Sequence, residues 1–308
     1  MCTHCRADVP YGEDCAYRSL EAPDAASTSV ASAGPLDQGN MQEIADYLVT
    51  GFWQETEGRG ARSFDIATGG SITANIAPLT NAGEALAEAA LQAWTDATGI
   101  QFVLTTSNFA DIVIDDSDTF SAYASSNYST SGEVFNAFVN IGRGWNGFNT
   151  EIDGYTFQTY IHEIGHALGL GHAGPYNGNG SFSQDASFDA DSWQATTMSY
   201  FAQNENPNVD ASFAYAITTM PADILAIRTL YGTSGQTRTG DTTYWNNSTA
   251  GGVLDDLTSY NNPVTATIID DGGHDTLDFS NETVAQTIHA YGGGVSDVGG
   301  LTGNLIIY

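Results

Sequence analysis

Lysine is absent from this sequence, and its seven basic residues are all arginines. Aspartate and glutamate together number 37, so the formal net charge is −30 at pH 7. A charge of this size argues against nucleic acid or an anionic membrane as a partner. It suits calcium ions, a saline medium or simple solubility, and a well-solvated acidic surface explains most of it.

Long apolar segments are also missing, and no run is long enough to cross a bilayer. The chain does not open with a charged segment followed by an apolar one, so we expect no ordinary signal peptide. Its 308 residues are enough for one or two domains with a substantial core.

Cysteine is confined to the start of the chain, at Cys2, Cys5 and Cys15. The rest of the protein therefore has no disulfide, and its stability must come from packing and metal ions. Cys2 and Cys5 have the spacing of half a metal site, but a second such pair is lacking, so we interpret them as a reactive or tail-borne pair. Residues 1–35 show no periodicity, which predicts an irregular tail or pro-segment.

Three of the six histidines fall within eleven residues, in the sequence HEIGHALGLGH. His162 and His166 are four positions apart, so on a helix they share one face and can hold one ion. Glu163 lies beside that face, where a general base would act on a metal-bound water. Gly169 allows the helix to end, so that the chain can bring His172 back as a third ligand.

This motif predicts a catalytic zinc site, because three protein ligands leave the fourth position open. The alternative is a helix that carries histidines for no chemical reason. A bare HExxH occurs in unrelated helices, but the extended HExxHxxGxxH is the metzincin signature and is much more specific.

Hydrophobic periodicity predicts an α+β order of elements. We expect helices over residues 37–50, 80–97, 156–170 and 221–231, and strands within 63–77, 102–104, 112–114, 119–128 and 134–141. Residues 173–195 should form a long loop, and the Thr-, Asn- and Gly-rich composition after residue 235 predicts a second domain. The predicted core includes Met41, Ile44, Ala45, Leu48, Ala85, Leu86, Ala89, Ala90, Ala93, Trp94, Val134, Phe138, Ile141, Phe157, Ile161, Ile164 and Leu168.

The chain resembles the serralysins, a family of secreted bacterial metzincin proteases, from about residue 45 to its end. Besides the zinc motif, the resemblance rests on five stretches: residues 93–96 (AWTD), 156–160 (TFQTY), 191–194 (DSWQ), 198–201 (MSYF) and 223–227 (DILAI). It implies an α+β metzincin catalytic domain over residues 36–234, with a mixed twisted sheet and a zinc helix. The start of a β-rich calcium-binding domain of the β-roll (RTX) type would follow over residues 235–308.

The resemblance also implies the roles of individual residues. His162, His166 and His172 match the zinc ligands of the family, and Glu163 matches its general base. Met198 matches the methionine beneath the zinc site. Tyr200 matches a tyrosine that ligates the zinc, swings away and can donate to the oxyanion. Two residue sets match the calcium-binding segments: Arg238, Gly240, Thr242, Asp270, Gly272 and Asp275 for one site, and Gly273 with Asp275 for a second.

The expected function is therefore a secreted zinc endopeptidase of broad specificity. Its substrate would add a strand to a sheet edge within residues 119–128. The family implies protein or peptide substrates, a proteinaceous inhibitor, a monomeric state and type I secretion without an N-terminal signal. Because the chain stops before the family's calcium-binding repeats, we interpret it as cut short.

Three alternatives remain beside this reading. The first is a calcium-dependent secreted binding module on a metzincin scaffold, although an intact Glu163 favours an enzyme. The second is a latent precursor in which the Cys5 or Cys2 thiolate occupies the open zinc position. The third is that the two calcium segments bind no ion and are simply Gly-Asp turns in a β domain.

Overall fold

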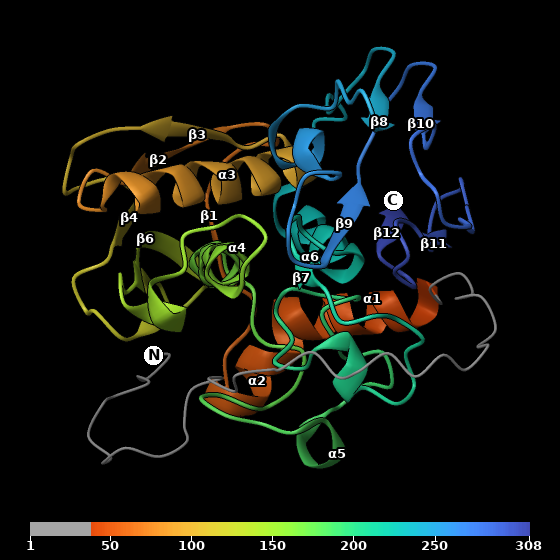
Figure 1. Cartoon of the computed structure of the whole chain (residues 1–308). Coiled ribbons are helices and arrows are strands. Elements are labelled where there is room, and N and C mark those ends of the chain that lie inside the picture. Colours follow the sequence, from red (N-terminus) through yellow and green to blue (C-terminus); the bar gives the residue numbers. More distant parts are fainter. Residues whose placement is uncertain (1–37) are drawn as a thin grey trace.

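The computed structural model describes residues 38–308 (Figure 1). The predicted tail, its three cysteines and the expected helix cap at Asp37 lie outside these residues. The helices are α1 (Gln38–Asp46), α2 (Phe52–Glu57), α3 (Asn81–Thr98), α4 (Tyr155–Ala167), α5 (Phe182–Asp185) and α6 (Pro221–Tyr231), with a π-helical segment η1 (Tyr47–Gly51) and the 3-10 segments η2 (Trp145–Phe148), η3 (Gln203–Glu205) and η4 (Gly252–Asp256).

The strands form three sheets. The first contains β1 (Ser63–Phe64), β2 (Ser71–Asn75), β3 (Gln101–Leu104), β4 (Ile112–Asp115), β5 (Ala122–Tyr128) and β6 (Glu133–Ile141). The second pairs β8 (Thr243–Trp245) with β10 (Thr276–Asp278), and the third joins β7 (Tyr215–Ala216), β9 (Val264–Ile268), β11 (Val295–Ser296) and β12 (Leu305–Ile307).

The first sheet is mixed, and its one antiparallel strand is β5. Strands β1, β6, β4, β2 and β3 are mutually parallel in that order, while β5 pairs antiparallel with β6. Within the described residues β5 has no other strand neighbour, so it forms an edge of this sheet. The segment expected to provide a substrate-binding edge therefore contains an edge strand.

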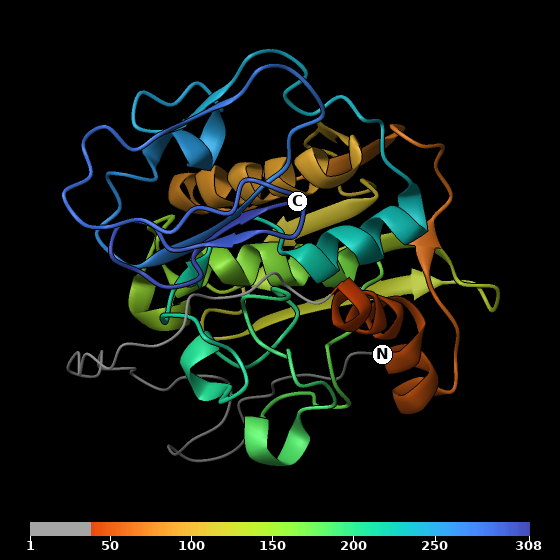
Figure 2. The same ribbon diagram turned by 90° about the vertical axis from the view of Figure 1, so that its right-hand side faces the viewer.

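Helices α3 and α4 pack against each other, and α4 also packs against β5 and β6 (Figures 1 and 2). Thr80 caps the start of α3, where its hydroxyl accepts from the Gly83 N–H at 3.3 Å, and Gly99 ends it at φ 83°. The Trp94 indole of α3 donates to the Ile161 carbonyl of α4 at 3.1 Å. This bond fixes the zinc helix against its neighbour.

Most core predictions are confirmed, and a few are wrong. Ala85 is exposed and Ala89 is half-buried, because Ala87 and Leu91 occupy the inward positions of α3 instead. Phe138 is only half-buried, since its neighbours on β6 point their side chains toward the helices.

Several element boundaries differ from prediction, including the start of β5, which lies at Ala122 and not at residue 119. The strand expected over 63–77 is two short strands, β1 and β2, separated by a turn. The zinc helix ends at Ala167 rather than residue 170. The first helical run does not stop at residue 50 but continues through η1 into α2, because Phe52 and Trp53 are buried. Burial of these aromatic side chains outweighs the helix-breaking tendency of Gly51.

The C-terminal region is β-rich and lies beside the helices, drawn in blue in Figure 1. Strand β9 pairs with β7, which precedes residue 235, so the third sheet joins chain from both sides of the expected boundary. The Asp153 carboxylate, just before α4, accepts the N–H groups of Asn261 and Asn262 at 2.7 and 2.8 Å. The C-terminal region is therefore bonded to the start of the zinc helix.

None of the helices in residues 38–308 combines the length and apolarity that a membrane crossing requires.

Candidate active site

The last two turns of α4 carry the first half of the candidate metal site. Its inward side chains Phe157, Ile161 and Ile164 are fully buried, and this packing fixes the rotation of the helix about its axis. His162 and His166 then share one face, as their spacing predicts, and their rings lie 4.6 Å apart between centroids.

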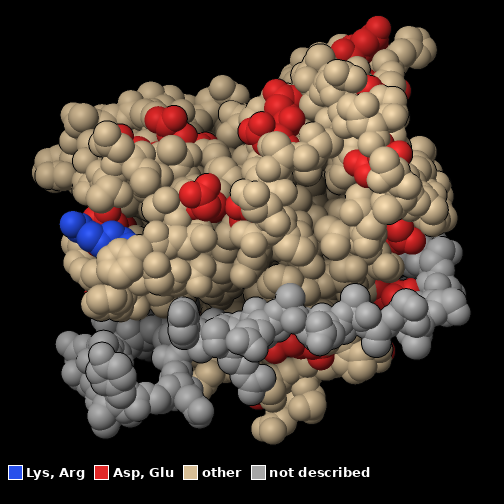
Figure 3. Space-filling model, viewed as in Figure 1, with Lys and Arg blue, Asp and Glu red and all other residues tan. Residues whose placement is uncertain are grey.

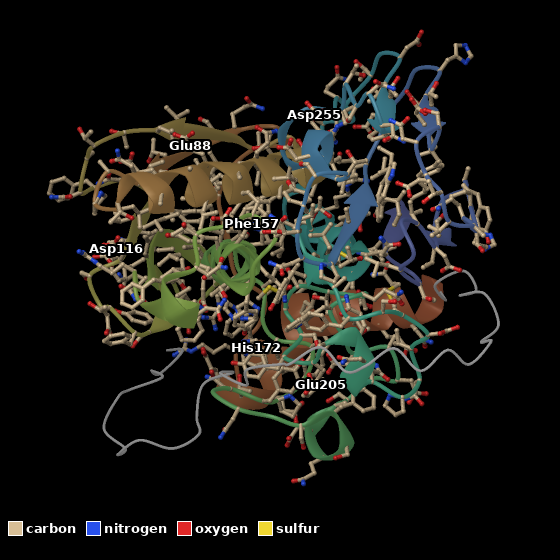
Figure 4. The ribbon with its side chains drawn as sticks, in the orientation of Figure 1. Glu88, Asp116, Phe157, His172, Glu205 and Asp255 are labelled. Carbon is tan, nitrogen blue, oxygen red and sulfur yellow. The ribbon has the colours of Figure 1, made fainter. Side chains whose placement is uncertain are left out.

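His172 reaches the same place because the chain reverses after α4. Gly169 has φ 113°, and a Cβ there would lie 2.0 Å from the Arg62 carbonyl oxygen, so only glycine fits this turn. The Trp53 indole donates to the Gly169 carbonyl at 2.8 Å, and the Gly171 N–H donates to the Leu48 carbonyl at 2.7 Å. The segment after the helix is thus docked on η1 and α2, and Figure 4 shows His172 between α4 and α2.

The three imidazoles can each direct a nitrogen to one point, with ligand atoms within 4.8 Å of one another. The His162 Nδ1 donates to the Thr197 carbonyl, and the His166 Nδ1 donates to the Leu170 carbonyl, both at 2.8 Å. Because a carbonyl only accepts, these bonds leave a lone pair on each Nε2. This tautomer is the one that a metal requires, so the donor set fits a zinc ion.

Burial keeps all three histidines neutral. It lowers the pKa of His162 to about 4, and it holds the pKa values of His166 and His172 well below their usual range. The Nε2 atoms of His166 and His172 lie only 2.9 Å apart. Two neutral imidazoles that face each other at this distance need a proton or a cation between them, which also fits a metal site.

Glu163 lines a cavity of about 50 Å³ together with His162 and Tyr200. Its side chain is 7% exposed, and burial raises its pKa to about 8. A carboxyl group in this environment is poised to hold or release a proton near neutral pH. The other residues that line the cavity are Ala122, Trp145, Tyr155, Gln158, Thr159, Gly178, Thr197 and Ser199.

Met198 lies under the zinc helix and is completely buried. Its sulfur is close to Gly165 of the zinc motif, where an added Cβ would lie 2.8 Å from Sδ. The placement matches the expected floor of the site.

Asp223 holds the turn that carries Met198. Its carboxylate accepts from the Thr196 hydroxyl at 2.5 Å, from the Thr197 N–H and hydroxyl at 2.8 Å each, and from the Met220 N–H at 2.9 Å. Since the Thr197 carbonyl in turn orients His162, Asp223 acts on the metal site through one intervening residue.

Tyr200 lies at the edge of the site, with its ring 4.6 Å from that of His172 between centroids. Its hydroxyl accepts a hydrogen bond from the Gly178 N–H at 3.1 Å. Tyr176 packs beside both rings, with centroids 5.6 Å from His172 and 4.7 Å from Tyr200. The Tyr176 hydroxyl donates to the buried carboxyl of Asp191 at 3.1 Å, and burial raises the pKa of Asp191 to about 6.

The two segments expected to bind calcium lie side by side, away from the histidines. The Thr242 N–H donates to Asp275 at 3.0 Å, and the Gly272 N–H donates to Asp270 at the same distance. Gly273 approaches Gly240 so closely that a Cβ would lie 2.6 Å from the Gly240 carbonyl. The Arg238 guanidinium pairs with Asp96 at 2.5 Å. Carboxylates and turn carbonyls are the oxygen donors that calcium prefers, so the donor chemistry is suitable.

Sequence reasoning did not assign the roles of Asp223 and Asp191, although both lie in stretches that carry the resemblance. An aspartate at the third position of a helix that begins with Pro221 indicates capping of that helix. The hydrogen bonds of Asp223 to Thr196 and Thr197 depend on tertiary contacts, and no local sequence pattern predicts them.

Two family models match the chain. The model described as Peptidase M10 serralysin C terminal matches residues 233–308, and the model described as Peptidase M66 matches residues 116–214. The second match includes the whole zinc motif and Tyr200.

Curated relatives are similar over most of this chain. Serralysin C of Dickeya chrysanthemi is 35% identical over 260 residues, which is 81% of this chain and 53% of that protein. Metallopeptidase AprA of Pseudomonas marginalis is 35% identical over 73% of this chain, and a serralysin of Photorhabdus sp. (strain Az29) is 34% identical over 72%. The chain spans about half the length of these relatives.

Among solved structures, one of myroilysin is 20% identical and covers 54% of this chain and 94% of that chain. Its TM-score is 0.33, too low to compare the two folds in detail.

Proposed function

Because the chain belongs to the serralysin-type metalloproteases, we propose that it is a secreted zinc endopeptidase that hydrolyses extended polypeptides. The observation that carries the proposal is the cluster of three neutral imidazoles, one of which, His162, lines a cavity together with the Glu163 carboxyl and with Ala122 of the edge strand β5. His162, His166 and His172 would hold the zinc ion. When bound, zinc supplies Lewis acidity, which polarises the scissile carbonyl and lowers the pKa of a coordinated water.

The residues of the chain supply the remaining chemistry. Strand β5 lies at an edge of its sheet among the described residues, so a substrate binds there by backbone pairing and with broad sequence preference. Glu163 accepts a proton from the attacking water and later delivers it to the leaving amine. The Tyr200 hydroxyl donates to the developing oxyanion once it turns from Gly178 toward the cavity.

The region 235–308 would serve as the start of a calcium-binding domain. The Asp275 carboxylate joins its two expected segments by accepting the Thr242 N–H, and a Ca²⁺ ion there would be held by carboxylates and turn carbonyls. Residues 36–234 would form the catalytic domain, which Asp153 and the pairing of β7 with β9 join to the C-terminal region.

The test replaces the general base in the zinc-loaded protein. Glu163→Gln should lower the rate of casein hydrolysis by a factor on the order of 10²–10⁴, the usual contribution of general acid–base catalysis. Zinc content, measured by elemental analysis, should stay at the wild-type level because the three histidines are intact. A zinc chelator should also abolish the wild-type activity.

The matched control is Glu151→Gln, an exposed glutamate on the loop before α4. It should retain wild-type activity. A Glu163→Gln protein as active as this control would contradict the proposed mechanism.

A further inference from the structure

Arg62 is a buried cation beside the turn that follows the zinc helix. Its side chain is 4% exposed, although arginine is almost never buried to this degree unless it is paired. The guanidinium donates to the Glu57 carboxylate at 2.7 Å, but its Nε has no hydrogen-bond partner among the described residues. A buried ion pair is weak evidence for stability, because desolvation of the two charges offsets their attraction. Stability alone therefore does not account for this arginine.

The Arg62 guanidinium contacts two aromatic rings. Its Cζ is 3.5 Å from the centroid of the Trp53 ring and 4.0 Å from that of Tyr128, distances typical of cation–π contacts. The Glu57 carboxylate that accepts from Arg62 also accepts from the Tyr128 hydroxyl at 2.8 Å. We call Trp53, Glu57, Arg62 and Tyr128 the arginine cluster. Because Trp53 and Glu57 lie on α2 and Tyr128 ends β5, the cluster joins these two elements.

On one side, the arginine cluster touches the turn that brings His172 back. The Trp53 indole donates to the Gly169 carbonyl at 2.8 Å, and a Cβ at Gly169 would lie 2.0 Å from the Arg62 carbonyl oxygen. Phe52, next to Trp53 on α2, meets the His172 ring edge to face, with centroids 5.1 Å apart. A displacement of Arg62 or of α2 would therefore reach the third candidate zinc ligand.

On the other side, the arginine cluster holds the end of strand β5. Pairing of β5 with β6 is regular from Ala122 to Asn127, and its register shifts between Asn127 and Tyr128. Such an irregularity disrupts the ladder and re-aims the side chains next to it. At this point the Tyr128 ring and hydroxyl are both held by the cluster. The strand that starts at the cavity with Ala122 thus ends against Arg62.

We infer that Arg62 is a positioning residue for peptide hydrolysis. The arginine cluster fixes strand β5, along which the substrate is expected to lie, relative to the turn that carries His172. It thereby sets the place of the scissile bond relative to the metal. A misplacement of about 1 Å can lower a rate on the order of 10²-fold, even when the changed residue is far from the chemistry. This inference rests on the proposed function and deepens it.

The first experiment replaces Arg62 by methionine in the zinc-loaded protein. Methionine keeps a long apolar side chain beside the rings and removes the charge and the planar group. For a fluorogenic peptide, kcat per folded molecule should fall on the order of 10²-fold, while KM stays close to the wild-type value because the edge of β5 is still present. The double variant Arg62→Met/Glu57→Gln, which leaves no unpaired carboxylate in the cluster, should show the same fall and guards against misfolding.

The second experiment does not depend on turnover. Cobalt(II) in place of zinc gives a visible absorption band whose position and intensity change with the arrangement of its ligands. The band of the Arg62→Met protein should differ from that of the wild type, because the turn that carries His172 has moved. A role in stability alone would lower the Tm and leave the band of the folded protein unchanged.

The matched control is Arg59→Met. Arg59 is exposed, and its Cζ lies 5.8 Å from the centroid of the same Tyr128 ring. This variant should keep the wild-type kcat and the wild-type band.

The inference is overturned if Arg62→Met has the kcat of this control, or if its cobalt band equals that of the wild type. A wild type that binds cobalt but hydrolyses no peptide would instead overturn the proposed function, so the two failures are distinguishable.

Discussion

The candidate zinc region, around the three histidines, and the expected calcium region, around Asp270 and Asp275, use carboxylates in opposite ways. Around the histidines, Glu163, Asp191 and Asp223 are all buried. In the calcium region, Asp275 and Asp271 are exposed, and their known bonds are to backbone N–H groups of neighbouring turns. Acidic side chains on the face drawn in Figure 3 are likewise scattered among uncharged residues at the surface.

The difference shows what each region needs in order to hold its shape. Burial raises the pKa of a carboxyl group unless donors compensate, so the zinc region depends on internal hydrogen bonds. The expected calcium region keeps Asp271 and Asp275 exposed to water, where their charge is well solvated. Loss of a carboxylate should therefore be costly in the first region, while strain in the backbone should matter most in the second.

The largest effect should follow from Asp223→Ala. This change leaves the Thr196 hydroxyl, the Thr197 N–H and hydroxyl, and the Met220 N–H without their acceptor inside the protein. We expect the free energy of unfolding to fall by about 3–5 kcal/mol. Zinc affinity should fall by about 10–100-fold, because Thr197 no longer fixes His162. Urea unfolding and zinc titration measure the two effects.

The control for Asp223 is Glu88→Ala on the exposed face of α3, labelled in Figure 4. It should change the free energy of unfolding by no more than about 0.5 kcal/mol. If the Asp223 variant behaved like this control, the turn that carries Met198 would not depend on the buried carboxylate.

A pH-dependent effect of intermediate size should come from Asp191. Its pKa is raised from 3.8 to about 6, so between these values the folded state binds a proton that the unfolded state has lost. The stabilising contribution is complete below about pH 3.8 and is lost as pH rises through 6. A shift of this size corresponds to about 3 kcal/mol across that window.

The measurement is the difference in unfolding free energy between the wild type and Asp191→Asn at pH 4, 5, 6 and 7. This difference should decrease steadily over the series, since asparagine does not titrate and the other carboxyl groups contribute equally to both proteins. A constant difference would show that Asp191 ionises normally in the folded state.

The smallest effect should come from the calcium region, through Gly273→Ala. Gly273 has φ 128°, and an added Cβ would lie 2.6 Å from the Gly240 carbonyl, so the two turns must move apart. We expect a loss of about 2 kcal/mol and a smaller rise in the Tm when calcium is added. Gly292→Ala is the matched control, since nothing lies within 4 Å of its added Cβ. An equal calcium response in both variants would argue against a cation site at these turns.

Local patterns predicted the helices of the catalytic part well. Both ends of α6 and the start of α3 agree with the expectation, because Pro221, Gly232 and Thr80 are strong boundary signals. Prediction was weaker where tertiary packing overrides propensity, as in the continuation through Gly51 into α2 and the half-buried position of Phe138. These outcomes depend on neighbours that are remote in the sequence.

The residues of the candidate site also separate into those that local patterns predict and those that only tertiary packing brings together. His162, Glu163 and His166 could be found from spacing alone, because one helix fixes their relative positions, and the glycines after the helix indicate the turn that returns His172. The bonds of Asp223 could not, since they join α6 to Thr196 and Thr197 in an earlier turn of the chain.

The sequence by itself determined the candidate chemistry of this protein: two imidazoles and a carboxyl group at helical spacing, then glycines that allow the chain to turn, then a third imidazole. The reason is that this chemistry is local and is encoded within eleven residues. The tertiary structure alone decided which groups support and surround that chemistry. Asp223 reaches the site from α6, and Asp153 links α4 to the C-terminal region. Asn140 on β6 holds the loop before β5 through hydrogen bonds to Asp118 and Ser121. Such contacts join residues far apart in the chain, and only packing of the whole molecule brings them together.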